Sequence, residues 1–181
     1  MSVLQRTLRL AVPLLLVLAA CGGGGGGSSG PTAPPPPTPG IVFTPSSAGA
    51  SGITLTAATA PNTSTLLLEV RANSVTDLYG VAFDLKYPNT VLRYVGATQG
   101  TFLPGATFQA VEGPAGTLVV GLSKLGTTAG TSGSGVLLTL QFQSVAAGTG
   151  AFTFTNNQAI DSTFTNLTGL SWSAGTVAVT L

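Results

Sequence analysis

Short runs of alternating apolar and polar residues fill the chain between residues 41 and 181, and the runs are separated by glycine, proline, asparagine and serine. Neighbouring residues of a β-strand point to opposite faces of a sheet, so such a run describes a strand with one buried and one solvent-facing side. In the run 81–87 the large apolar side chains share one face, and the outward positions are Ala82, Asp84 and Lys86. No stretch of this region shows a convincing amphipathic-helix period, so the pattern predicts strands as its only regular elements.

Nine strands are expected, at residues 53–57, 65–72, 78–87, 91–97, 107–111, 117–122, 136–145, 151–155 and 175–181. A region of about 140 residues with this many short strands fits one two-sheet sandwich and is long enough to bury a core. No longer period recurs along the chain, so one domain is expected rather than an array of repeats. In the run 136–143 the even-numbered residues are expected to face the core, and Leu137 with the other odd-numbered residues to face outward.

The first twenty residues have the pattern of an export signal. Arg6 and Arg9 form a positive start, an apolar run follows at residues 10–18, and small residues lead into Cys21. Such a run is too short to span the hydrocarbon core of a membrane, which takes about 20 apolar residues, and is better interpreted as a removed signal. The stretch 18–21, Leu-Ala-Ala-Cys, resembles the lipobox of bacterial lipoproteins. That resemblance implies cleavage before Cys21 and lipid attachment to its sulfur.

A tether follows the cysteine. Residues 22–40 consist of a glycine-rich part and a proline-rich part, which favour a flexible coil and a stiffer extended rod respectively. The expected organisation is a signal peptide at residues 1–20, the lipidated cysteine and tether at residues 21–40, and a folded domain at residues 41–181. The chain is therefore expected to be exported and lipid-anchored to the bacterial cell envelope, at the outer membrane or the cell surface.

The composition argues against several kinds of function. Only 6% of the residues are charged and none is histidine, which disfavours a nucleic-acid partner and removes the usual catalytic triads. The carboxylates are scattered singly, and Ser123 beside Lys124 is interpreted as a solvated turn, so no enzyme activity is expected. Cys21 is the only cysteine, which excludes a disulfide within the chain.

One oxygen-rich cluster is a candidate metal site, and it consists of Asn156, Asn157 and Asp161. Calcium takes six to eight oxygen ligands, and a cluster with one carboxylate would bind it weakly. A hydrogen-bonded loop is therefore favoured over a calcium site, and no metal or cofactor is predicted.

Several segments carry a resemblance to a known family. Residues 78–92 (LYGVAFDLKYPNTVL) resemble an early strand and turn of bacterial cohesin domains. Residues 100–104, 119–126, 133–142 and 174–179 resemble later segments of the same family, in order and spacing. The resemblance implies an all-β fold, a nine-stranded jelly-roll sandwich of the cohesin and carbohydrate-binding-module type. It also implies a usual partner, the calcium-loaded dockerin module of polysaccharide-degrading enzymes.

The resemblance places a partner-binding face on one strand and on a later turn. The corresponding positions in this sequence are Gly80, Ala82, Asp84, Lys86, Ser123, Lys124 and Leu125. In the family the first outward positions of that strand are often Asn and Asp, whereas here they are Gly80 and Ala82. The turn is often acidic in the family, and here it is not. The resemblance therefore implies the location of the surface and not its chemistry.

Three functions remain open on the sequence alone. The leading hypothesis is a membrane-anchored module that holds a protein partner, with a dockerin-bearing enzyme and a link to polysaccharide degradation as its specific form. The second is direct carbohydrate binding through Tyr79 or Trp172, although core or edge packing is the commoner role for such residues. The third is a structural role in an envelope assembly or filament through pairing of strand edges.

Overall fold

The longest strand of the domain, β3 (Thr65–Lys86), belongs to both sheets of a β-sandwich in the computed structural model. The structure describes residues 38–58, 64–114 and 116–181, all within one compact unit, Pro36–Leu181. The expected signal peptide, Cys21 and the expected tether up to residue 37 lie outside the described residues. The described part of the chain has no helix, and therefore none that could span a membrane.

Besides β3, the described residues form nine further strands. They are β1 (Gly40–Pro45), β2 (Gly52–Ala57), β4 (Leu92–Gln99), β5 (Thr107–Glu112), β6 (Thr117–Ser123), β7 (Thr131–Ser144), β8 (Gly148–Asp161), β9 (Ser171–Ser173) and β10 (Gly175–Thr180). All their pairings are antiparallel except that of β2 with β9.

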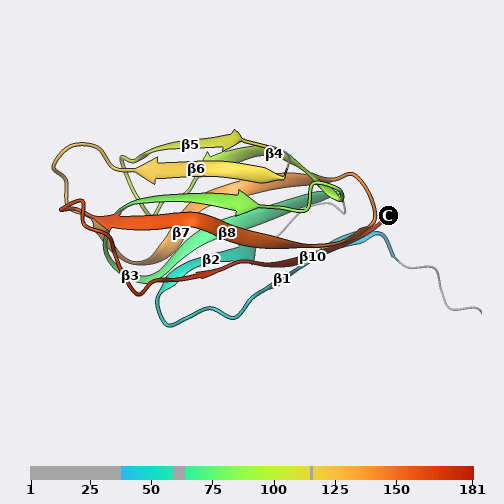
Figure 1. The fold of residues 1–181 in the computed structure, drawn as a ribbon, viewed down its shortest axis with the longest axis horizontal. Helices are drawn as coiled ribbons and strands as arrows, with labels where there is room; N and C mark the ends of the chain where they lie inside the picture. Colours follow the sequence, from blue (N-terminus) through green and yellow to red (C-terminus); the bar gives the residue numbers. More distant parts are fainter. Residues whose placement is uncertain (1–37, 59–63, 115) are drawn as a thin grey trace, which may run out of the picture. The chain divides into compact units, whose positions relative to one another are not determined.

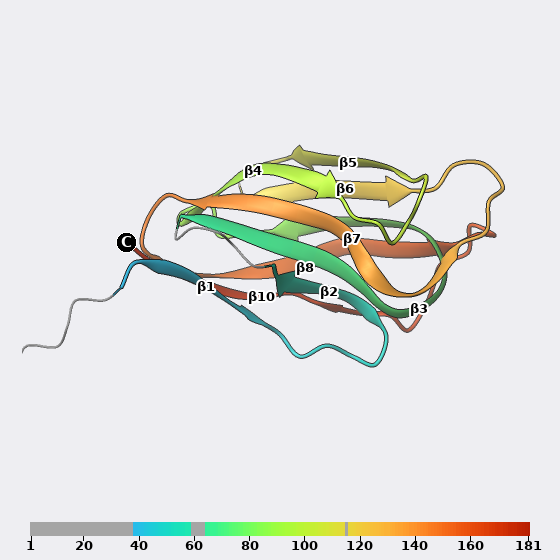
Figure 2. The same cartoon turned by 180° about the vertical axis from the view of Figure 1, so that it is seen from behind.

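A change of partner in the middle of β3 creates the two layers. Its first part pairs with β2 and β7, and its second part, from Leu78 onward, pairs mainly with β6 and β8. Ser74 and Asp77 lie at the change, and both have positive φ angles, 47° and 53°. These left-handed residues and two register shifts bend the strand from one sheet into the other. One sheet therefore has the order β5-β6-β3-β8-β10-β1 (Figure 1), and the other contains β4, β7, β3, β2 and β9, seen from behind in Figure 2.

The core lies between the sheets and confirms most of the predicted faces. Val81, Phe83, Leu85 and Tyr87 are buried, none more than 6% exposed, whereas Ala82 and Lys86 are exposed. Phe142 of β7 lies at the centre, with the rings of Tyr87, Tyr94 and Phe152 between 5.2 and 5.8 Å from it. Edge-on contacts of this kind add to the burial of apolar surface, which is the main source of stability in a chain without a disulfide.

Leu137 is an exception to the expected alternation. The odd-numbered residues of 136–143 were expected to face outward, yet Leu137 is 0% exposed, like Leu138 beside it. Val70 pairs with Leu138 and Arg71 pairs with Val136, so Leu137 is the extra residue of a β-bulge. A bulge places two residues opposite one and shifts the alternation, which is why both leucines are buried.

The number and lengths of the strands also differ from the expectation of nine. Two expected strands, 65–72 and 78–87, are parts of β3, and β8 extends well beyond the expected 151–155. The strands β1 and β9 were not predicted. β1 lies at an edge and contains no fully buried residue, and β9 has three residues, so neither shows a long alternating pattern.

The two ends of the sandwich are distinct. Gly40 of β1 pairs with Thr180 of β10, so the beginning and end of the domain lie side by side (Figure 1). The loops 124–130 and 162–170 lie at the opposite end. They are joined there through Asp77, which accepts hydrogen bonds from the backbone amides of Gly130 and Ser162.

Candidate functional site

The outward positions of β5, β6, β3 and β8 form two regular rows across one sheet. The first row consists of Thr107, Ser123, Gly80 and Ile160, and the second of Gln109, Gly121, Ala82 and Gln158. The middle of each row has small side chains and its two ends have longer ones. This arrangement gives the sheet a low floor between two raised walls.

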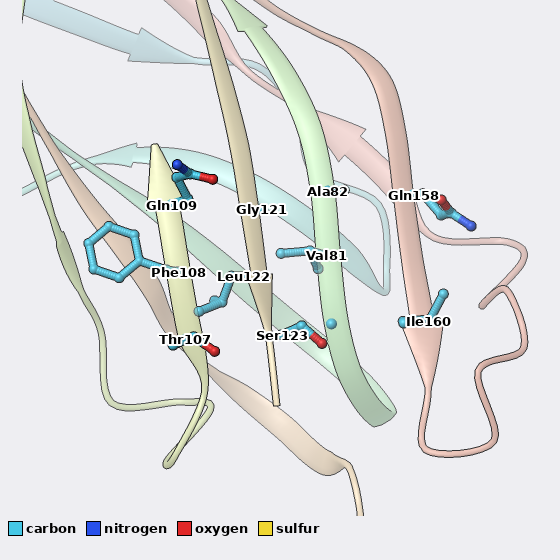
Figure 3. A pocket seen from close by; sticks show the side chains of 11 residues that line it. Val81, Ala82, Thr107, Phe108, Gln109, Gly121, Leu122, Ser123, Gln158 and Ile160 are labelled. Atoms are coloured by element: carbon cyan, nitrogen blue, oxygen red, sulfur yellow. The ribbon is translucent and has the colours of Figure 1, made fainter. Parts of the chain in front are cut away.

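An open hollow of about 570 Å³ lies over this floor (Figure 3). Gly80, Ala82, Gly121 and Ser123 form the floor, and the walls come from Thr107 and Gln109 on one side and Gln158 and Ile160 on the other. Gly121 has open space above it, because a Cβ atom added there would meet nothing within 4 Å. Gly80 is packed more tightly, since its added Cβ would lie 3.0 Å from Oγ of Ser123. The hollow thus exists because two glycines and an alanine occupy outward positions in the middle of a sheet.

No charged side chain lines the hollow. Asp84 occupies the next outward position of β3, and its Oδ2 atom accepts a 2.6 Å hydrogen bond from Nδ2 of Asn156. Lys124 follows the floor residue Ser123, and its Nζ atom donates a 2.6 Å hydrogen bond to the carbonyl of Ala129 in the same loop. The charges nearest the hollow along these strands therefore bond to neighbouring residues of this domain.

Asp77 holds the two end loops in place. It accepts hydrogen bonds from the Ser162 hydroxyl at 2.7 Å, the Ser162 amide at 3.3 Å and the Gly130 amide at 2.9 Å. The bond from the Ser162 hydroxyl is the main cause that lowers the pKa of Asp77 below its ordinary value near 3.8. A Cβ at Gly130 would lie 2.4 Å from the Asp77 carbonyl oxygen, so the close approach of the loop requires glycine.

Asp161 organises the second of these loops. Its Oδ1 atom accepts hydrogen bonds from the Thr163 amide, the Thr163 hydroxyl and the Thr165 amide, at 2.8, 2.7 and 2.9 Å. These bonds, that of the Thr163 hydroxyl foremost, lower the pKa of Asp161. Asn156 bonds to Asp84 and does not join them. The expected hydrogen-bonded loop is confirmed for Asp161. Within the described residues, no three carboxylate, cysteine or histidine side chains are grouped where they could hold a metal ion.

The structure brings three residues of the predicted partner face together. Gly80, Ala82 and Ser123 meet at the hollow, and Asp84 and Lys86 continue the outward positions of β3 beyond it. Lys124 turns toward its own loop, and Leu125 is 66% exposed at the end of the sandwich. The seven positions therefore lie along two adjacent strands and the loop after β6, but only three of them line the hollow.

The two aromatic residues considered for sugar stacking, Tyr79 and Trp172, differ in how deeply they are buried. Tyr79 is 1% exposed, its hydroxyl donates a 2.6 Å hydrogen bond to the Gly126 carbonyl, and its ring packs 5.2 Å from that of Phe164. It therefore has no free face for a sugar ring, which corrects the carbohydrate-binding assignment of Tyr79. Trp172 is half-buried and packs against Phe154 at 5.4 Å and Phe83 at 5.8 Å.

Five residues that border the hollow were not predicted from the sequence. They are Gly121, Thr107, Gln109, Gln158 and Ile160. Alternation along β6 would have placed Gly121 on the face of Ser123. For Gln158 and Ile160 the expected strand ended at residue 155, and a register shift next to Asn156, whose φ is 50°, obscures the alternation.

The fold and the hollow together define a class of molecule, a β-sandwich module with an open hollow, lined by no charged side chain, on one sheet face. Residues 51–179 match the family model of the Cohesin domain, and the chain belongs to the cohesin family. No curated protein sequence matches the chain.

Solved cohesin structures share this fold at low sequence identity. The second type II cohesin module of the adaptor scaffoldin ScaA of Acetivibrio cellulolyticus has a TM-score of 0.62 and 17% identity, over 73% of this chain and 98% of that one. A non-cellulosomal cohesin of the archaeon Archaeoglobus fulgidus has a TM-score of 0.58 and 22% identity, over 70% and 89% of the two chains. The sixth cohesin of A. cellulolyticus scaffoldin B, solved in complex with a Cel5 dockerin mutant, has a TM-score of 0.56 and 21% identity, over 68% and 96%.

Proposed function

We propose that this chain is a non-catalytic binding module that holds a dockerin-type protein partner on the hollowed face of β5, β6, β3 and β8. Membership of the cohesin family supports a protein partner, and the scaffoldin B cohesin was solved with a dockerin bound. The observation that carries the proposal is the hollow itself, which lies at Gly80, Ala82 and Ser123, where the sequence resemblance located a partner surface.

The chemistry of the face suits binding better than catalysis. The chain has no histidine, and no charged group lines the hollow, so neither an acid–base pair nor a nucleophile with its base is present there. The walls offer amides from Gln109 and Gln158 and a hydroxyl from Thr107, which can form hydrogen bonds at the rim of an interface. A centre with small, uncharged side chains and a rim with polar ones is in keeping with the usual anatomy of a protein–protein interface.

We further propose that the module is displayed from a membrane through a lipid on Cys21. This proposal rests on the lipobox-like residues 18–21 and on the Gly- and Pro-rich segment that follows. β1 begins at Gly40, beside the end of β10, whereas the loops 124–130 and 162–170 next to the hollow are at the other end of the sandwich. A tether joined to β1 therefore leaves the hollow's end of the domain free to meet a partner. A dockerin-bearing enzyme that acts on polysaccharide is the specific partner proposed.

The direct test is affinity capture with the full chain and a panel of calcium-loaded dockerin modules encoded in the same genome, with and without a calcium chelator. Binding of at least one dockerin is expected. It should be abolished by Ala82→Arg, which places a long charged side chain on the floor of the hollow. The matched control is Ala178→Arg, at another exposed position on a strand of the same sheet, outside the hollow, where binding should persist. Failure of every dockerin to bind the unaltered chain would exclude the dockerin form of the proposal.

A further inference from the structure

We infer that Phe164, in the loop 162–170, is a stacking platform for a neutral, β-linked pyranose unit of a polysaccharide. The site lies outside the hollow and needs no protein partner, so the inference goes beyond the proposed function. Three observations support it: the exposure of the ring, the backbone conformation that presents the ring, and the uncharged polar groups around it.

Phe164 is the only aromatic residue in the described part of the chain that is mostly exposed, at 65%. Its ring packs edge-on with that of Tyr79, with 5.2 Å between the ring centroids and 70° between the ring planes. An edge-on contact covers at most one face of one ring, so at least one face of the Phe164 ring stays open. The stacking role that burial excludes for Tyr79 is therefore available to the ring packed against it.

The backbone presents this ring at a conformational cost. Phe164 has a φ angle of 61°, in the left-handed region, where the Cβ atom crowds the following carbonyl oxygen. Glycine or asparagine would form the same turn with less strain, so the turn itself does not call for phenylalanine. Strained residues of this kind occur preferentially at functional sites, ligand clamps among them.

Hydrogen bonds hold the strained turn in place. The Phe164 amide donates to the Asp161 carbonyl at 3.0 Å, and the Asp161 amide donates to the Thr165 carbonyl at 2.9 Å. The Asp161 carboxylate accepts bonds from the amides of Thr163 and Thr165, on both sides of Phe164 in the chain. The ring is thus positioned before a ligand arrives, and little conformational entropy is lost on binding.

The side chains next to Phe164 in the chain are polar and uncharged. Thr163, Thr165 and Asn166 are all exposed. The Gln158 amide nitrogen donates to the Asn166 amide oxygen, which leaves the oxygen of Gln158 and the nitrogen of Asn166 for a ligand. Hydroxyl and amide groups beside a flat ring suit a sugar, which has hydroxyls at its rim and C–H groups on its faces.

The chemistry of the site also selects among sugars. In β-linked glucose and xylose units the hydroxyls are equatorial, so axial C–H groups on both faces can contact the electron-rich face of an aromatic ring. An acidic sugar is disfavoured, because the carboxylates of Asp77 and Asp161 lie at this loop and the loop contains no lysine or arginine. The expected ligand is therefore a neutral polymer of such units.

The experiment tests the full chain on an array of neutral oligosaccharides that includes β-linked glucose and xylose oligomers. Binding to at least one of these oligomers is expected. Phe164→Leu keeps an apolar side chain at the strained position but removes the flat ring, and it should weaken binding at least tenfold, by an estimate of about 1.4 kcal/mol. Phe164→Tyr keeps a flat ring, and its affinity should stay within about threefold of that of the unaltered chain.

Leu125→Ala is the matched control, because Leu125 is 66% exposed in the other loop at the same end of the sandwich. Sugar binding should persist in that variant, and dockerin capture should persist in Phe164→Leu. Absence of sugar binding by the unaltered chain, survival of binding in Phe164→Leu, or its loss in Phe164→Tyr or Leu125→Ala would overturn the inference. Loss of dockerin capture in Phe164→Leu without any sugar binding would make the ring a protein contact instead. Failure of every dockerin would leave the inference standing, because the array needs no protein partner.

Discussion

Ala82 of β3 lies directly opposite Gly121 of β6, so two of the smallest residues stand side by side in the middle of an exposed sheet. Most outward positions of a central strand favour β-branched or aromatic residues, which pack well on a pleated surface. Glycine at such a position lowers stability, because it adds backbone entropy to the unfolded chain and contributes no packing. At the proposed binding surface, the small residues that keep the hollow open therefore lower the stability of the domain.

Substitutions of Gly121 and Gly80, the two glycines of the floor, should change the stability of the domain in opposite directions. Gly121→Thr is expected to raise the free energy of unfolding by about 1 kcal/mol, because the new side chain enters open space on a strand. Gly80→Thr should lower it by about 1–3 kcal/mol, since its Cβ would lie 3.2 Å from the backbone oxygen of Leu122. Urea denaturation of both variants checks the pair. A loss of stability in Gly121→Thr would show that the position is not open.

Because of the bulge, Leu137 is expected to contribute to stability as much as a core residue does, although the alternation of the sequence places it on the surface. Leu137→Ala should lower the free energy of unfolding by about 3 kcal/mol, because the side chain is fully buried. Leu125→Ala is the control, with an expected change within about 0.5 kcal/mol, because Leu125 is 66% exposed. Chemical denaturation measures both. Equal small effects would place Leu137 on the outside and contradict the register of β3 with β7.

Asp77 predicts a stability difference that depends on pH. Its pKa is lowered in the folded domain, so its contribution is present above the ordinary value near 3.8 and is lost as the pH falls through the lowered value. Asp77→Asn keeps a residue that tolerates the positive φ but removes the charged acceptor of the Ser162 hydroxyl. Its melting temperature should be lower than that of the unaltered chain at pH 7, and the gap should close near pH 2. A gap that stays constant with pH would rule out the carboxylate as its cause.

The contribution of Tyr87 to stability is expected to depend on pH in the opposite direction, with a loss at alkaline pH. Burial, together with its hydrogen bond to the Glu112 carboxylate, raises the pKa of Tyr87 to about 12. Its contribution is therefore full below the ordinary value near 10 and is lost as the pH rises through about 12. Unfolding free energies of the unaltered chain and of Tyr87→Phe should differ most below pH 10 and converge toward pH 12. Phenolate absorbance should show one fewer late-titrating group in the variant, and an unchanged titration would contradict the assignment.

Much of the fold is predictable from local pattern, and the exceptions have identifiable causes. The strand segment around Phe83 was predicted with the correct buried and exposed faces, because period-two alternation depends only on neighbouring residues. Leu137 was misassigned because a bulge shifts that alternation, and a bulge is visible only in the pairing with β3. Tyr79 was considered as a sugar platform, whereas its burial depends on the loop that carries Gly126 and on Phe164, which is 85 residues further along the chain.

The sequence by itself determined that the domain is all-β, a prediction that rests on alternation along each strand. Five ordered segments of the sequence resemble cohesin domains, and the placement of Gly80, Ala82 and Ser123 on one surface rests on that resemblance. Only the tertiary structure decided that Gly121 of β6, Gln109 of β5 and Gln158 of β8 join that surface and make it a hollow. The register between strands sets which residues share a row, and it comes from long-range pairing that no local pattern specifies.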